Sequence, residues 1–116
     1  MEAVEDAMST TFQTTAQRLS TLAVLYEQGQ ASQLMDRTLD KLLAQEAEQC
    51  RVQLAEMEAD MAVFERQFAM TSAEFMRRYQ AGETDDRMDF VEWASLVHMR
   101  DNQLQRLGLL TGENAA

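Results

Sequence analysis

The chain has 116 residues, which suits one domain with a modest core, and it contains no proline and only four glycines. Twenty acidic residues against ten basic ones give a net charge of −10. This balance disfavours direct binding to nucleic acid or to anionic membranes and favours a basic partner, although surplus acid can also simply keep a helix solvated.

Helix-forming residues dominate the composition, and we therefore expect an all-α protein in one domain over residues 1–116. The single cysteine, Cys50, cannot form an internal disulfide, which fits a cytoplasmic location. No stretch approaches the roughly 20 apolar residues of a membrane span, and the acidic N-terminus does not resemble a secretion signal. Residues 1–8 and 109–116 are expected to be loose.

The first predicted helix begins at about Ser9, because apolar residues recur from there at spacings of three and four. Gly29 predicts its end, since glycine accepts the left-handed conformation found just beyond many helices. The residues expected on its apolar face are Phe12, Ala16, Leu19, Ala23 and Tyr26.

A long central helix is predicted from about Ala31 to Phe68, where nothing interrupts helical periodicity. Apolar residues recur every seven positions in two series offset by four, which is the heptad pattern of a coiled coil. A helix of about 36 residues is about 54 Å long and cannot bury its own stripe. We therefore expect the flanking helices to fold against it in a hairpin or bundle, and we expect a homodimer whose seam comprises Leu43, Cys50, Leu54, Met57, Met61 and Phe64.

A second apolar face on the same helix leaves two interpretations open. It could contact a second neighbour, or its alanines could merely raise helix propensity. The residues of this face are Val52, Ala55, Ala59, Ala62 and Val63.

Two shorter helices are predicted after the long one. Thr71 and Glu74 have the spacing of a capping box that starts a short helix, which ends at Ala81 and Gly82. Asp89, as an N-cap with Glu92, predicts the start of the last helix, which Gly108 would end. Burial is expected for Phe75, Met76 and Tyr79 of the short helix and for Phe90, Trp93, Ala94, Val97 and Leu104 of the last, with Leu96 and Leu107 at its edge.

The residues do not form a catalytic or metal-binding pattern. His98 is the only histidine, which excludes the usual helical di-metal motif, and no glycine-rich phosphate loop or paired-cysteine zinc pattern is present. Cys50 lies in the heptad stripe, where a thiol behaves as a small apolar group. We therefore expect no catalytic residue, no cofactor, no metal and no enzyme activity.

The segment from Tyr79 to Trp93 is the candidate partner-binding site. It carries five acidic residues against one arginine, and aromatic anchors beside carboxylates are typical of a surface that binds a basic protein. The alternative is structural: acids in a first helical turn stabilise its dipole, and Trp93 could pack the last helix on the long one. The predicted partner-binding residues are Tyr79, Glu83, Asp85, Asp86, Asp89, Phe90 and Trp93.

Residues 31–107 resemble small helical prokaryotic antitoxin-like proteins, which are often encoded beside a small toxin. The upstream run from Ser32 to Leu43 is similar, and the resemblance continues through Phe64-Glu65, Met70-Thr71-Ser72, Phe75, Tyr79, Gly82-Glu83, Asp85-Asp86 and Asp89-Phe90-Val91-Glu92-Trp93. It implies a protein that neutralises a cognate toxin, such as a basic ribonuclease, by direct binding. No DNA-binding helix-turn-helix is recognisable. The alternative function is a coiled-coil scaffold that acts by homo-oligomerisation.

Overall fold

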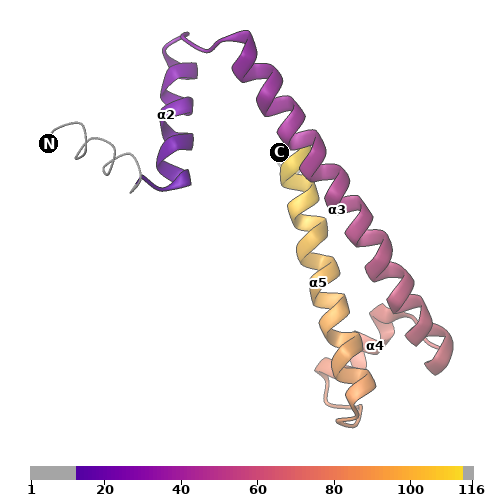
Figure 1. Cartoon of the computed structure of the whole chain (residues 1–116). Coiled ribbons are helices and arrows are strands. Elements are labelled where there is room, and N and C mark those ends of the chain that lie inside the picture. Colours follow the sequence, from indigo (N-terminus) through magenta and orange to yellow (C-terminus); the bar gives the residue numbers. More distant parts are fainter. Residues whose placement is uncertain (1–12, 114–116) are drawn as a thin grey trace, which may run out of the picture. The chain divides into compact units, whose positions relative to one another are not determined.

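A computed structural model of the chain describes residues 13–113, and this part consists of helices joined by short turns, without a strand. The helices are α2 (Thr15–Glu27), α3 (Gln33–Phe68), α4 (Ser72–Gln80) and α5 (Met88–Thr111) (Figure 1). The all-α prediction is thus confirmed. The chain divides into two compact units, Met1–Asp40 and Lys41–Ala116, and the division falls inside α3.

In the first unit, α2 begins at a complete capping box. The Thr14 hydroxyl accepts the Gln17 N–H at 3.1 Å, and the Gln17 side chain accepts the Thr14 N–H at 2.8 Å. The helix ends at Glu27, and Gly29 follows with a φ of +70°, as predicted. The predicted helical residues Ser9 to Phe12, and the expected loose residues 1–8, lie outside the described part of the chain.

No residue of α2 is buried. Its main polar link to the beginning of α3 is the Tyr26 hydroxyl, which donates a hydrogen bond to Asp36 Oδ1 at 2.7 Å. This bond and the neighbouring negative charge raise the pKa of Tyr26 to about 12.

The second unit is a helical hairpin in which α5 runs antiparallel to α3 (Figure 1). Arg106 near the end of α5 pairs with Glu46 near the beginning of this part of α3 at 2.8 Å. At the other end of the hairpin, the rings of Phe68 and Phe90 lie 4.9 Å apart. The short helix α4 closes this end and packs on α5.

The core lies where the three helices meet, with Trp93 at its centre. The Trp93 ring stacks on Phe75 at 4.0 Å, and Phe64 and Phe68 of α3 lie beside it at 5.7 and 5.8 Å. Burial of each large apolar side chain contributes roughly 1.5–3 kcal/mol, and ring pairs add to this. The buried cluster comprises Met61, Phe75, Met76, Phe90, Trp93, Ala94 and Val97.

The predicted caps of the two later helices are only partly correct. Thr71 does cap α4 by accepting the Glu74 N–H at 3.1 Å. The reciprocal half of the capping box is wrong, because the Glu74 carboxylate bonds Arg77 and Arg78 instead. A different carboxylate stabilises this helix start: Glu65 of α3 accepts the Ser72 N–H at 2.7 Å.

The predicted N-cap of α5 is wrong. The helix begins at Met88, and the N-cap position is Arg87, which makes no capping bond with its side chain. Asp85 fixes the chain just before the helix, since its carboxylate accepts the Arg87 N–H at 3.1 Å and pairs with the Arg87 guanidinium. Asp89 therefore lies within the first turn.

The end of α5 also differs from the prediction. Gly108 is a buried residue inside the helix, which continues to Thr111 and stops at Gly112 with a φ of +79°. Of the residues expected to be loose, 109–111 are therefore helical, and 114–116 lie outside the described part of the chain. Leu104 is 46% exposed, because Gln103 takes the position facing α3, where its carbonyl and side-chain oxygens accept the Cys50 thiol at 3.2 and 3.3 Å.

Candidate functional site

The structure divides the predicted partner-binding segment between the core and the surface. Trp93 is fully buried, and Phe90 is 8% exposed. The Trp93 Nε1 donates a buried hydrogen bond to Ser72 Oγ at 2.9 Å. Tyr79 is half-buried against Phe75. These aromatic residues build the hairpin, so the structural alternative describes Trp93 and Phe90 better than the role of exposed anchors.

The acidic turn of the same segment is partly neutralised by the chain itself. Asp85 pairs with Arg87 at 2.7 Å, which lowers the pKa of Asp85 to about 2 through the side-chain hydrogen bonds. Glu83 lies 3.5 Å from the Arg77 guanidinium, and Asp89 accepts a long hydrogen bond from Gln67. The turn therefore offers less unpaired charge to a partner than its composition suggests.

The predicted dimer seam is largely covered within one chain. Cys50 is fully buried, and Leu54 and Met61 are 6% and 4% exposed. Met57 and Phe64 are half-buried, and only Leu43 is well exposed, at 45%. The neighbour that the heptad pattern requires is α5 over most of this length, so the seam is not an open surface.

An open apolar groove on the second unit was not predicted. It runs between α3 and α5, has a volume of about 540 Å³, and exposes Val63, Val91 and Met99 by 40–51%. Its floor reaches the core, because Phe64 stacks on Trp93. The lining residues are Asp60, Val63 and Phe64 of α3 and Val91, Glu92, Ser95, Leu96 and Met99 of α5.

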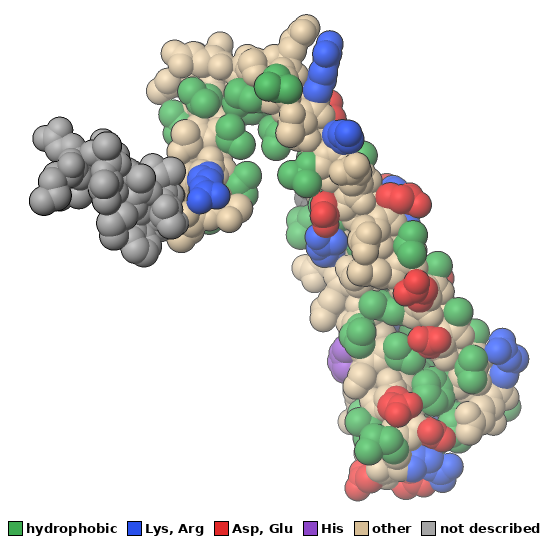
Figure 2. Space-filling view, viewed as in Figure 1, with side chains coloured by type: hydrophobic (Ala, Val, Ile, Leu, Met, Phe, Trp, Pro, Cys, Tyr) green, Lys and Arg blue, Asp and Glu red, His purple; other side chains and the backbone are tan. Residues whose placement is uncertain are grey.

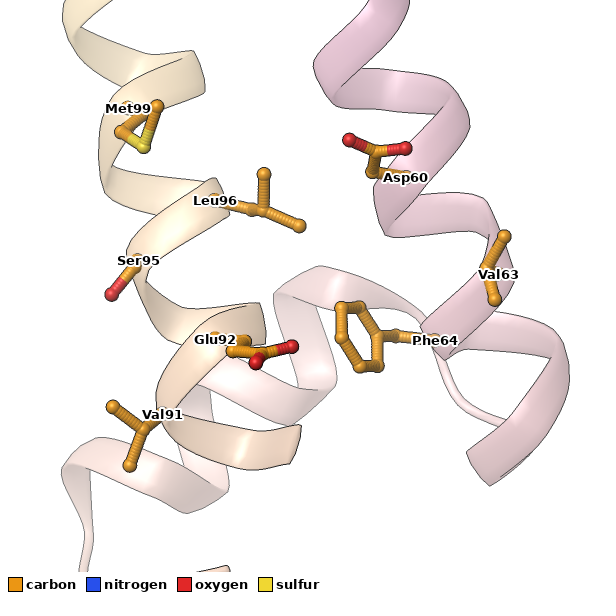
Figure 3. Close-up of a pocket in the computed structure, with 8 residues that line it drawn as sticks. All are labelled: Asp60, Val63, Phe64, Val91, Glu92, Ser95, Leu96 and Met99. Atoms are coloured by element: carbon orange, nitrogen blue, oxygen red, sulfur yellow. The ribbon is translucent and has the colours of Figure 1, made fainter. Parts of the chain in front are cut away.

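Two carboxylates give this groove its charge. Figure 3 shows Asp60 and Phe64 pointing from α3 toward α5, and Glu92 and Leu96 pointing from α5 toward α3. Among the described residues, neither Asp60 nor Glu92 forms an ion pair with a lysine or an arginine. Figure 2 shows the same character more widely, with acidic side chains interspersed among hydrophobic ones along the second unit.

A smaller apolar hollow of about 220 Å³ lies in the first unit. No charged side chain lines it, so its lining does not indicate which kind of ligand it could bind. Its residues are Leu22, Leu34, Met35, Thr38 and Leu39.

The sequence pattern indicates some of the exposed apolar residues that line the groove. Val63 belongs to the second apolar face predicted for the long helix, and Val91 and Met99 are apolar residues eight positions apart on the last helix, outside its buried face. Sequence alone could not show that these two faces adjoin. In the sequence, Glu92 fits a capping position and the acidic segment, and neither of these points to a groove.

The described residues hold no group of three or more His, Cys, Asp and Glu side chains arranged to bind a metal ion. His98 is exposed, and Cys50 is a free, buried thiol. None of the helices in residues 13–113 combines the length and apolarity of a membrane-spanning segment. No known protein family, curated protein or solved structure matches this chain.

Proposed function

We propose that this chain is a protein-binding module that acts in the cytoplasm as an antitoxin, neutralising a small basic toxin by direct contact. The observation that carries the proposal is the exposed apolar groove between α3 and α5, with two carboxylates, Asp60 and Glu92, that form no ion pair within residues 13–113. The net charge of −10 supports a basic partner, because opposite charges accelerate encounter and penalise wrong partners. The resemblance to antitoxin-like proteins supports the biological setting.

The test is co-expression with the protein encoded next to this chain. We expect that protein alone to arrest bacterial growth and this chain to restore growth. The double variant Val63→Asp and Met99→Asp should abolish rescue, because it places two charges on the exposed apolar lining of the groove.

The matched control is Val52→Asp with Leu109→Asp. These residues are 50% and 69% exposed, lie on the same two helices and are outside the groove. The control adds the same charge and should still rescue growth. A neighbouring protein that is not toxic, or whose toxicity the chain does not relieve, would refute the proposal.

Homodimerisation through the predicted seam remains a prediction, and with it the alternative of a scaffold. Leu43 is available to a second chain, whereas Cys50, Leu54 and Met61 would become available only if α5 moved away. Light scattering of the purified chain tests the scaffold against the antitoxin, since an assembly larger than a dimer without a second protein would favour the scaffold.

A further inference from the structure

The exposure of the groove between α3 and α5 indicates the size of its occupant. Val63 and Met99 are each about half exposed, at 51% and 49%, so the apolar surface is an open strip. Small ligands generally require concave sites that cover most of their surface. An extended apolar strip is instead suited to a segment of another macromolecule.

The dimensions of the groove favour a helical segment. Val91, Ser95 and Met99 lie along one line of α5, and eight residues of helix span about 12 Å, which corresponds to two turns of a docked helix. The walls are helices, and the described residues offer no sheet edge to which a strand could be added. A helix satisfies its own backbone hydrogen bonds and presents apolar side chains at i, i+3, i+4 and i+7 to such a groove.

The charge of the groove defines the polar side chains of this occupant. Asp60 comes from α3 and Glu92 from α5, so a carboxylate stands on each helix that borders the groove (Figure 3). The nearest arginine along α5, Arg100, is paired with Asp101 at 3.0 Å. A docked helix would therefore face a carboxylate from each wall. Within the described residues, no ion pair neutralises either carboxylate.

We propose that the groove binds a basic amphipathic helix of the partner protein. The apolar face of that helix lies on Val63, Phe64 and Met99, and its lysine or arginine side chains pair with Asp60 and Glu92. This inference rests on the proposed protein-binding function and specifies the partner segment that the groove recognises.

The test uses two designed alanine-rich helical peptides of about 16 residues. Both carry leucine at i, i+4 and i+7, one has lysines on the flanks of this stripe, and the other has glutamates there. We expect the wild-type chain to bind the lysine peptide more tightly in a fluorescence-anisotropy titration. The preference should decrease at about 0.5 M salt, because salt screens exposed charges.

The decisive variant is Asp60→Lys with Glu92→Lys. Loss of two exposed ion pairs and gain of two repulsions should weaken binding of the lysine peptide by about tenfold and strengthen binding of the glutamate peptide by about tenfold. The matched control is Glu58→Lys with Glu113→Lys, which makes the same change in net charge at exposed residues outside the groove. It should shift either affinity by less than about threefold. Circular dichroism verifies that both variants keep their helices.

Three results would overturn the inference. The peptide preference could fail to reverse in the groove variant, or the control could shift it equally. The third result is a wild-type dimer that dissociates when Val63→Asp and Met99→Asp are introduced. The occupant of the groove would then be a second copy of this chain. These outcomes are distinguishable from failure of the proposed function: growth rescue with no peptide reversal refutes only the helix, whereas peptide reversal with no growth rescue refutes only the antitoxin role.

Discussion

Ser72 joins three parts of the hairpin through two hydrogen bonds. Its backbone N–H donates to Glu65 of α3, and its hydroxyl accepts the indole N–H of Trp93 from α5. Ser72 is 4% exposed and Trp93 is fully buried, so water does not readily replace either partner. A buried donor that loses its acceptor costs the free energy of its desolvation without compensation.

We predict that Ser72→Ala lowers the free energy of unfolding by about 1–3 kcal/mol, because it leaves Trp93 Nε1 buried without an acceptor. Urea denaturation followed by fluorescence measures this directly, since Trp93 is the only tryptophan in the chain. Ser95→Ala is the matched control at an exposed serine of α5, and its effect should be close to zero. Equal stabilities of the two variants would show that the indole bond is not important.

At the scale of elements, α4 is a short helix whose stability depends on charge as well as on burial. Its only acidic residue in the first turn, Glu74, bonds the guanidinium groups of Arg77 and Arg78, each at 2.9 Å. These hydrogen bonds lower the pKa of Glu74 from 4.5 to about 2. As a first-turn residue, Glu74 is also near the positive end of the helix dipole.

This shift gives a pH dependence with a definite sign. A carboxyl group whose pKa is lower in the folded state stabilises the fold above its unfolded pKa and loses that contribution as the pH falls. We predict that Glu74→Gln is less stable than wild type at neutral pH, and that the difference disappears between about pH 4.5 and 2. Thermal melting of both proteins across this range measures it. The matched control is Glu58→Gln, at an exposed carboxylate of α3 that forms no ion pair within the described residues, and at neutral pH it should be about as stable as wild type.

The helices themselves were largely predictable, and their ends were predictable where local chemistry decides them. The bounds of α3 follow from an unbroken heptad pattern, and Thr71 and Gly29 act as predicted. The helix end predicted at Gly108 is wrong. Glycine has a low helix propensity, but Gly108 is buried by packing inside α5, and the helix continues past it. The N-cap predicted at Asp89 is wrong, because Asp85 accepts the N–H of Arg87, the residue immediately before the helix begins.

The site was less predictable than the helices, because it depends on how they are arranged. A heptad stripe shows that a helix needs a neighbour, but it does not show whether that neighbour is α5 of the same chain or a second chain. Tryptophan is a frequent anchor residue in protein interfaces, yet the fold places Trp93 in the core. The groove exists because the packing of α3 and α5 leaves Val63 and Met99 exposed on its two walls, and no local pattern encodes that.

At the scale of the whole molecule, burial is unevenly distributed between the two units. Every apolar residue in the buried core of the described chain lies between Ala47 and Val97, within the second unit. In the first unit, α2 buries no residue, although it is well capped. A helix of 13 residues is marginal in water unless packing supports it. The cooperative unfolding of the chain should therefore belong to the hairpin of α3, α4 and α5.

We predict that a chain beginning at Gln33 keeps the urea midpoint of the complete protein, measured by Trp93 fluorescence, because no core residue is removed. Helicity should fall by the contribution of α2. In the same shortened chain, Phe75→Ala should lower the free energy of unfolding by about 3–5 kcal/mol, since it removes the ring stacked on Trp93 and leaves a cavity. A large fall in midpoint on shortening would mean that α2 contributes to the stability of the hairpin, and the two units would then unfold as one.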